Sequence, residues 1–325
     1  MSPLLDLRPA GLYCPGGDFY IDPWDPVERA VITHAHSDHA CAGSQSYLTT
    51  PAGSQLLRAR FGADLPVQTA RYRERITLGD TAISLHPAGH ILGSAQVRIE
   101  SGGEVWVVSG DYKLAPDPTC EPFEPLRCHT FVTEATFALP IFRWPAEAQV
   151  IEDIVQWWRG NQQAGKISLL FAHPLGKAQR LLAGLTGSIY AHPSVEKYSQ
   201  VYRGQGIALP ETPPAGAVPR NALILAPPLA HNSDWARRFA PVSTALASGW
   251  MRIRGTRRRR SLDRGFVLSD HADWPALLGA IDETRAETIW VTHGHRAPLV
   301  RWLQEHGRQA LAIPARFEGS EGAAS

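Results

Sequence analysis

The segment Thr33–His39 holds the side chains of this sequence that are best suited to chemistry. Three histidines and one aspartate follow the pattern His-x-His-x-Asp-His, directly after the apolar run Ala30–Ile32, which predicts a short buried strand. Imidazole nitrogens and carboxylate oxygens are ligands for Zn²⁺, or for Mn²⁺ in a harder site. Four such ligands on one loop exceed what one tetrahedral ion usually takes from a contiguous stretch. We therefore expect two metal ions, with the first two histidines facing one ion and the Asp-His pair facing the other. A histidine-rich surface loop is the alternative.

Further ligand-type residues follow other strand-like runs along the chain. A single histidine at a strand end is more often structural, so only the ordered series carries weight. Polar residues at the ends of neighbouring strands collect at one edge of an α/β protein, where sites usually form. We expect this series to meet the histidine loop: Asp22, His90, Asp111, Glu134, His271 and His293.

The secondary structure expected around these residues differs between two parts of the chain. Strand-like runs dominate the first part of the chain, with a hairpin signal at Ser101–Gly103. From about Leu139 helical and strand-like patterns alternate, with helices expected over 146–159 and 177–185. After the arginine-rich segment near residue 257, strand-like runs that end in ligand-type residues return. The sequence predicts an α/β protein with a discontinuous domain (1–140 and 262–325) and an inserted domain (141–261).

The composition does not suggest a disordered, secreted or membrane-spanning protein. The 325 residues are 44% hydrophobic and 19% charged, which is typical of a globular chain, and the net charge of +1 makes no global case for nucleic-acid binding. The four cysteines form no Cys-x-x-Cys pair, which favours a reducing compartment. No signal-peptide pattern and no apolar stretch of about 18 residues occurs, so we expect a soluble cytoplasmic protein without membrane contact.

Two local features could bind phosphate. Seven arginines fall within residues 252–264, just before His271 in the sequence. A solvated charged loop is the ordinary interpretation, but this position favours phosphate contacts by Arg257, Arg258, Arg259 and Arg260. His173 and Lys177 flank a predicted strand-to-helix turn whose free amides could hold a second phosphate, with ordinary capping as the alternative.

These motifs resemble the metallo-β-lactamase superfamily and, within it, the β-CASP nucleases. The His-x-His-x-Asp-His loop indicates only the superfamily, whereas Glu134, His271 and His293 around an insertion indicate the β-CASP branch. The likeness covers about residues 8–318. It is most specific to the bacterial ligase-associated DNA exonucleases, on stretches that include Val132–Phe137, Pro174–Arg180 and Gly265–Trp274. The resemblance implies a metallo-β-lactamase αββα sandwich with an inserted α/β β-CASP domain.

The resemblance also implies a role for each candidate residue. Asp111 would bridge two divalent ions (Zn or Mn), and Asp22 would orient a ligand loop. Glu134 would support His271 beside the scissile phosphate, so the implied catalytic residues are His271, Glu134, Asp38 and Asp111. The remaining ligands would divide between the ions, with His34, His36 and His90 on the first and Asp38, His39 and His293 on the second.

The function implied is a metal-dependent DNA exonuclease that uses a two-metal-activated water, with His271 as the proton donor. It would digest single-stranded DNA or duplex ends, 5′ to 3′, in repair alongside an ATP-dependent DNA ligase and a helicase. By this resemblance, Artemis-like DNA enzymes usually carry an apolar residue at the position of His293, whereas the RNA-cleaving branch carries histidine. A ribonuclease is therefore the alternative. A small-molecule metallohydrolase would need neither the insertion nor the arginines. A binding module with a degenerate site does not fit, because every ligand position holds a competent residue.

Overall fold

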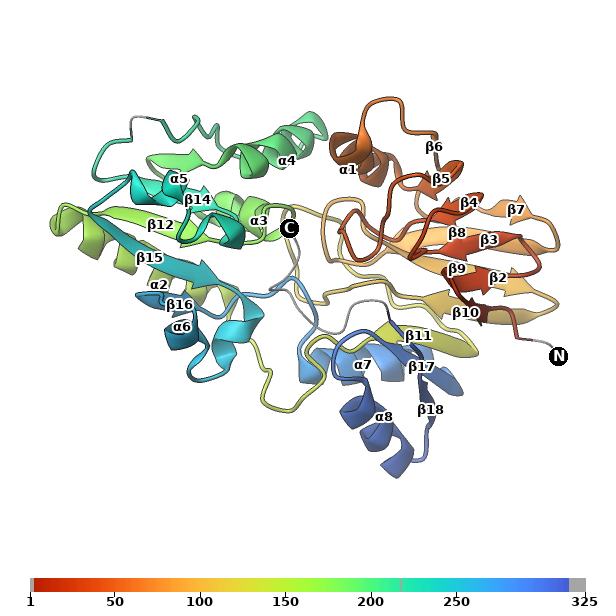
Figure 1. Cartoon of the computed structure of the whole chain (residues 1–325). Coiled ribbons are helices and arrows are strands. Elements are labelled where there is room, and N and C mark those ends of the chain that lie inside the picture. The colour runs from red at the N-terminus through yellow and green to blue at the C-terminus, as the bar shows by residue number, and fades with distance from the viewer. Residues whose placement is uncertain (1–2, 217, 316–325) are drawn as a thin grey trace. The chain divides into compact units, whose positions relative to one another are not determined.

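The computed structural model describes residues 3–216 and 218–315 and groups them into two compact units (Figure 1). The first unit contains the described residues up to Pro140 and from His271 onward, and the second contains Ile141–Asp270. Both units combine helices with strands, so the α/β class expected from the sequence is confirmed. The described helices include none whose length and apolar character would let it cross a membrane.

The first unit begins with a six-stranded sheet whose strands lie in sequence order. Strands β1 to β3 are antiparallel and β3 to β6 are parallel. Helix α1 (Pro51–Phe61) follows β5, and it begins where the Thr50 hydroxyl accepts from the Gly53 amide. The strands are β1 (Asp6–Arg8), β2 (Gly11–Cys14), β3 (Phe19–Ile21), β4 (Arg29–Val31), β5 (Ser46–Thr49) and β6 (Val67–Thr69).

A seven-stranded sheet forms the second layer of this unit, in the order β18-β17-β11-β10-β9-β8-β7. Strands β7 to β10 are antiparallel, and β10, β11, β17 and β18 are parallel. Gly102 and Gly103, both at positive φ, make the expected hairpin turn between β9 and β10. The strands are β7 (Ile76–Leu78), β8 (Thr81–Pro87), β9 (Ala95–Ser101), β10 (Glu104–Val108), β11 (Thr130–Glu134), β17 (Thr288–Thr292) and β18 (Gln309–Ala312), and the helices are α7 (Trp274–Thr284) and α8 (Arg296–Glu305).

Two hydrophobic cores lie on opposite faces of the seven-stranded sheet. The first lies between the two sheets and joins Val31 of β4 to Val97 of β9. The second joins Phe131 of β11 to Leu277 of α7 and Leu303 of α8. Successive side chains of a strand point to opposite faces, so the same strands can supply both cores. The carboxyl ends of these packed strands carry the candidate site.

The second unit is built on a five-stranded, all-parallel sheet in the order β13-β14-β12-β15-β16. Helix α2 (Glu147–Gln163) buries Val150, Ile154 and Trp158, and α3 (Lys177–Gly184) also begins close to its expected position. The strands are β12 (Ile167–Phe171), β13 (Ile189–Ala191), β14 (Leu223–Ala226), β15 (Val242–Ala247) and β16 (Arg264–Phe266), and the other helices are α4 (Pro193–Gly204), α5 (Asp234–Arg237), α6 (Thr256–Arg259) and the 3₁₀ turns Pro228–Ala230 and Gly249–Arg252.

Strand β16 belongs to the second unit. It pairs in parallel with β15, with Ala245 opposite Arg264 and Ala247 opposite Phe266. The sequence pattern predicts that the returning domain begins at residue 262, before this strand. In the structure the second unit continues to Asp270, and His271 is the first residue of the chain back in the first unit.

Candidate metal centre

The expected ligands all lie in the first unit, directly after strands. The loop after β4 supplies four of them, and the loops after β8, β10 and β17 supply one each. Two backbone bonds to the His36 carbonyl, from the amides of His39 and Ala40 at 3.3 and 3.0 Å, turn the loop after β4 so that its side chains gather. The fold therefore brings residues from distant parts of the sequence to one region.

The first group of ligand atoms comes from His34, His36, His90 and Asp111, and these atoms all lie within 4.8 Å of one another. Nδ1 of His36 lies 3.2 Å from His34 Nε2 and 3.1 Å from His90 Nε2, and His34 Nε2 lies 3.5 Å from Asp111 Oδ2. A tetrahedral ion with bonds near 2.0–2.1 Å separates its ligand atoms by about 3.3–3.4 Å. The spacing of these atoms fits one such ion.

A second group adjoins the first through Asp111. Nε2 of His39 lies 3.3 Å from Asp111 Oδ1 and 3.9 Å from Asp38 Oδ2. Asp111 thus presents one oxygen to each group, as a carboxylate that bridges two ions would. Nε2 of His39 is buried and makes no hydrogen bond within the described chain. A buried nitrogen that makes no hydrogen bond but lies close to two carboxylate oxygens suits a bound cation.

His293 lies beside the second group. Its ring stacks on that of His39 with 4.8 Å between centroids, and both histidines line a cavity of about 30 Å³. The backbone has φ +51° at His293 and +59° at Gly294, where an added Cβ would lie 2.3 Å from the Ala135 carbonyl oxygen. Among the described residues, the ligand atoms of Asp38, His39 and Asp111 lie within 4.8 Å of one another, and His293 does not belong to that group.

Asp22 and Thr33 set the tautomers of two histidines. Oδ2 of Asp22 accepts from Nδ1 of His39 at 2.7 Å and from the Thr33 hydroxyl at 2.6 Å, while Oδ1 accepts from the Thr33 amide. The Thr33 oxygen lies 3.1 Å from Nδ1 of His34. These bonds direct Nε2 of both histidines toward the cluster, where each nitrogen offers a lone pair when its ring is neutral. Sequence reasoning missed Thr33, whose only signal is its place before the motif.

His271 and Glu134 form a buried pair next to Asp111. Nδ1 of His271 lies 3.0 and 2.9 Å from the two carboxylate oxygens of Glu134 and 3.9 Å from Asp111 Oδ2. The backbone amide of Tyr112 donates to Glu134 Oε1 at 2.9 Å and so fixes the carboxylate. The ring of His271 is thereby oriented, and Nε2 is its nitrogen not bonded to Glu134.

Burial and charge set the protonation of the cluster. Burial, followed by the neighbouring His39, lowers the pKa of His34 well below its usual value. Burial also acts to lower the pKa of His39, but Asp111 and Asp38 outweigh it and raise that pKa well above the usual range. Burial opposes ionisation of Asp111, yet His39 and His271 hold its pKa well below the ordinary value. The site therefore offers a neutral imidazole at His34 and an ionised carboxylate at Asp111, and His39 would release a proton when a metal binds.

The residues expected to contact phosphate lie in the second unit. Nδ1 of His173 is 2.8 Å from the Leu175 carbonyl oxygen, a local contact within the turn before α3. Lys177 is buried, and its ammonium lies 3.6 Å from Oδ2 of the buried Asp270. Phosphate binding by this turn stays a prediction, with ordinary capping as its alternative.

The arginine segment forms the short helix α6. Arg257, Arg258 and Arg259 are exposed and Arg260 is half-buried. Arg257 donates to the Asp263 carbonyl, and Arg259 donates to the Thr256 hydroxyl at 3.1 Å. The second unit therefore carries an exposed basic surface at this helix.

Comparison with known proteins adds sequence relatives. No family model matches the chain. It is 33% identical over 310 residues to a probable DNA ligase of Opitutus terrae, covering 93% of this chain and 30% of that protein. It is 30% identical over 198 residues to transcription termination factor FttA of Pyrococcus abyssi, covering 48% of this chain and 30% of that protein. It is 29% identical over 143 residues to endoribonuclease ysh1 of Aspergillus fumigatus, covering 42% and 16%. The chain thus spans 30% or less of the length of these relatives.

A solved structure resembles the fold as a whole. The crystal structure of a protein of unknown function from Enterococcus faecalis V583 matches with a TM-score of 0.57 at 11% identity, over 89% of this chain and 80% of that one. This likeness concerns the fold alone. Together with the ligand motifs, the sequence relatives place this chain in the β-CASP branch of the metallo-β-lactamase superfamily.

Proposed function

We propose that this chain is a metal-dependent phosphodiesterase that digests DNA from an end. The observation that carries the proposal is the meeting of two ligand groups on Asp111, directly beside the His271–Glu134 pair. A carboxylate shared by two groups suits a pair of divalent ions, and an oriented histidine next to them suits transfer of a proton to a leaving oxygen.

The architecture supports this assignment. We assign the two packed sheets, with α1 on one side and α7 and α8 on the other, to a metallo-β-lactamase αββα sandwich. The second unit, with its parallel sheet, corresponds to an inserted β-CASP domain. We propose the domains expected from the sequence, 1–140 with 262–325 and 141–261, except that residues 262–270, which include β16, belong with the inserted domain.

The donor atoms of the first unit would hold two ions, Zn²⁺ or Mn²⁺. Bound divalent ions activate water near neutral pH and neutralise phosphoryl oxygens. His34, His36 and His90 would hold one ion and Asp38, His39 and His293 the other, with Asp111 between them. Asp22 holds His39 and Thr33 so that the ligand loop is already in place when the metals arrive.

His271 would hold the proton that the leaving oxygen receives. Glu134 accepts from Nδ1, so the ring cannot turn, and the opposite nitrogen, Nε2, would carry the transferred proton. General acid catalysis of this kind contributes about 10²- to 10⁴-fold.

The substrate assignment rests on the relatives. A similar sequence forms part of a longer protein named as a probable DNA ligase, which supports DNA as substrate and a role in repair beside a ligase and a helicase. Digestion from 5′ to 3′ belongs to the same proposal. A ribonuclease is the second candidate, because His293 is the residue found in RNA-cleaving members and one relative is named an endoribonuclease. A small-molecule hydrolase would leave the second unit and the basic helix α6 without a use.

Replacing His271 by alanine tests the catalytic assignment. The variant should cleave about 10²- to 10⁴-fold more slowly than the parent while keeping the same metal content, measured by elemental analysis of the purified proteins. His306→Ala, at an exposed position of the same unit, is the matched control and should keep both rate and metal. A loss of metal in His271→Ala would make this histidine a ligand instead.

Digestion of end-labelled strands tests the substrate. Matched DNA and RNA carrying a 5′ or a 3′ label are incubated with Zn²⁺, Mn²⁺ or a chelator. The proposal expects metal-dependent release of the 5′ label from DNA as the first product. Preferential cleavage of RNA would favour the ribonuclease, and undiminished cleavage in the chelator would contradict the metal mechanism.

A further inference from the structure

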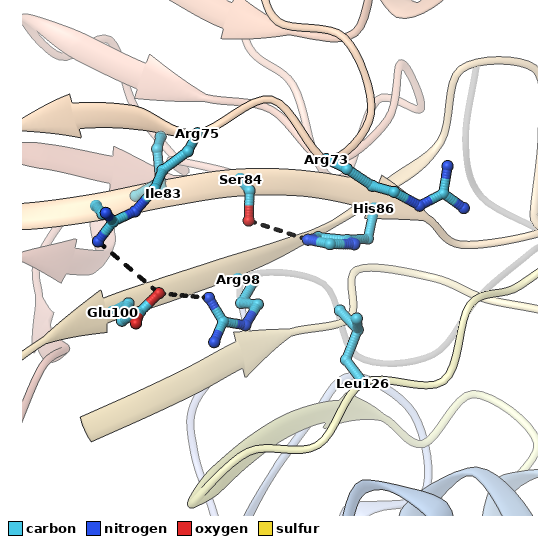
Figure 2. A pocket seen from close by; sticks show the side chains of 9 residues that line it. Arg73, Arg75, Ile83, Ser84, His86, Arg98, Glu100 and Leu126 are labelled. Carbon is cyan, nitrogen blue, oxygen red and sulfur yellow. Dashed lines mark hydrogen bonds and ion pairs between the residues drawn. The ribbon is translucent and has the colours of Figure 1, made fainter. Parts of the chain in front are cut away.

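A polar pocket lies on the seven-stranded sheet, away from the metal ligands (Figure 2). Val97 and Ile99 of β9 enter the core between the sheets, so Arg98 and Glu100 point to the opposite face. Over β10, β11 and β17 that face is packed against α7 and α8. Over β8 and β9 it carries polar side chains, and the antiparallel register sets Ser84 directly opposite Arg98.

The pocket has a volume of about 260 Å³ and a mixed lining. Ser84 and His86 come from β8 and Arg98 from β9, while Arg73 and Arg75 come from the segment before β7. Ala82, Ile83 and Leu126 supply apolar wall. The volume lies just under the roughly 300–1,000 Å³ usual for small-molecule sites, which suits a small ligand with one charged end.

Positive charge exceeds negative charge around the pocket. Glu100 accepts from Arg98 at 2.7 Å and lies 4.0 Å from Arg75. Glu124 lies 2.8 Å from Arg73. The Arg98 hydrogen bond lowers the pKa of Glu100, so that carboxylate is ionised at neutral pH. Three guanidinium groups thus face two carboxylates, and one positive charge remains before His86 is counted.

The arginines are placed to donate into the pocket. Arg98 is held by Glu100 through Nη1, and its side chain is 27% exposed. Arg75 is 67% exposed, and its contact to Glu100 is long, at 4.0 Å. Figure 2 shows Arg75 and Arg98 on either side of Glu100, with Ser84 and His86 above Arg98. A guanidinium group held on one edge can offer its other N–H groups to an anion as a planar fork.

His86 and Ser84 add a donor that responds to an anion. Nε2 of His86 lies 2.9 Å from the Ser84 oxygen, and Nδ1 lies 3.2 Å from Glu124 Oε1. Burial lowers the pKa of His86, partly offset by Glu124, so in the free protein the Ser84 hydroxyl donates to a neutral imidazole. A nearby anion favours the imidazolium. Nε2 then donates to Ser84, and the hydroxyl proton of Ser84 can turn toward the anion.

We propose that this pocket binds the phosphate of a small organic phosphomonoester, of the size class of a nucleoside monophosphate. A tetrahedral phosphate accepts hydrogen bonds from several directions, as Ser84 of β8, Arg98 of β9 and Arg75 of the segment before β7 would supply. The apolar wall around Leu126 would receive the organic part. No residue that lines the pocket belongs to the candidate metal ligands, so the site is separate from the cleavage chemistry.

Calorimetric titration of the metal-loaded full chain with adenosine monophosphate tests the proposal. Arg75→Gln and Arg98→Gln should each weaken binding about tenfold or more, because each removes a charged hydrogen-bond donor. The control Arg159→Gln, at an exposed arginine of α2, should bind as the parent does. In parallel, NMR should show shifts at residues 82–86 and 98–100, and the pKa of His86 should rise in the presence of the nucleotide.

Three results would overturn the site. One is equal binding of adenosine monophosphate by the parent and by Arg75→Gln. Arg75 makes a long contact of 4.0 Å to Glu100, so this variant should fold and keeps the test valid even where Arg98→Gln does not fold. Another is adenosine binding as tightly as its monophosphate, since the phosphate would then not be recognised. The third is binding of a glutamate-rich peptide in the absence of nucleotide binding, which would assign the pocket to an acidic protein partner.

Discussion

Asp22 determines which nitrogen of His39 faces the candidate metal centre. Its carboxylate accepts hydrogen bonds from Nδ1 of His39 at 2.7 Å and from the Thr33 hydroxyl at 2.6 Å. One carboxylate therefore orients the second ligand group directly and His34 through Thr33. Groups that orient ligands in this way are nearly as important to metal affinity as the ligands themselves.

Replacing Asp22 by asparagine should reduce metal affinity about 10- to 100-fold, because the neutral amide cannot accept from Thr33 and His39 as the carboxylate does. Competition with a coloured chelator measures this affinity. Asp18→Asn is the control, since Asp18 bonds only Tyr13 and Arg29 among the described residues at the surface of the same unit. Equal metal affinities of Asp22→Asn and the parent would show that Asp22 does not orient the metal ligands.

Cys128 shows how burial controls a thiol. Desolvation raises its pKa from 9.0 to about 12. In the unfolded chain the thiol ionises near its usual value, and in the folded chain it stays protonated. The unfolded state therefore loses a proton first, and the stability contribution of Cys128 is complete below about pH 9 and is lost as pH rises towards 12.

Two measurements check the behaviour of Cys128. At pH 8 an alkylating reagent should modify the half-buried Cys41 and Cys120 well before Cys128, as peptide mass spectrometry would show. Between pH 9 and 11, Cys128→Ser should lose less unfolding free energy than the parent, by up to about 1.4 kcal/mol per pH unit. If the reagent labelled Cys128 in the folded protein as fast as Cys41, burial would not be raising the pKa of the Cys128 thiol.

At the scale of elements, the turn after β10 brings Asp111 between the two ligand groups. Gly110 has φ +57°, and a Cβ there would lie 2.6 Å from the Thr33 oxygen that Asp22 holds. The turn and the ligand loop thus approach more closely than any side chain would permit. Glycine is required at this position for both its conformation and its size.

Gly110→Ala should therefore destabilise the protein and weaken metal binding together. Gly102→Ala is a matched control, because Gly102 has φ +58° but nothing within 4 Å of an added Cβ. Both variants bear the cost of positive φ, about 1–2 kcal/mol, and only Gly110→Ala adds the clash with Thr33. Denaturant unfolding and chelator competition measure the two effects. Indistinguishable variants would show that the Thr33 contact does not constrain the turn.

At the scale of the whole molecule, charge is nearly balanced, at +1, and any attraction to nucleic acid must come from local surfaces. Helix α6 provides such a surface in the second unit, where three consecutive arginines are exposed. The polar pocket of Figure 2, for which we propose a small phosphomonoester, is another local region of positive charge, in the first unit.

Replacing Arg257, Arg258, Arg259 and Arg260 by serine should flatten the dependence of DNA affinity on salt. The slope of log affinity against log salt should fall by about 0.7 for each phosphate of a single strand that the variant no longer neutralises. Fluorescence anisotropy with a labelled oligonucleotide over a salt series measures it. The exposed Arg159 and Arg301, changed to serine, are the controls. A slope equal to that of the parent would exclude α6 from the DNA-binding surface.

The residue types of the candidate centre, and the strands that carry them, can be predicted without coordinates. Metal ligation requires imidazole and carboxylate groups, and a loop with four of them directly after an apolar run can be recognised without coordinates. The helical period and the alternation of apolar residues likewise predicted α2, β12 and the β9–β10 hairpin, because these depend on local patterns. What each ligand would do came from resemblance and remains a proposal.

Which of these groups come into contact depends on how the strands and helices pack. Asp111 between two ligand groups, Thr33 between Asp22 and His34, and Lys177 against Asp270 all join residues whose contact depends on sheet order and packing. Strand β16 joined the second unit because of its partner, β15, and not because of its own residues. The pocket at Arg98 exists because the register of β8 and β9 sets Ser84 opposite it. A shift of β8 by one residue would send Ser84 to the other face of the sheet, away from Arg98, and it is the burial of one face of the folded sheet that prevents this shift.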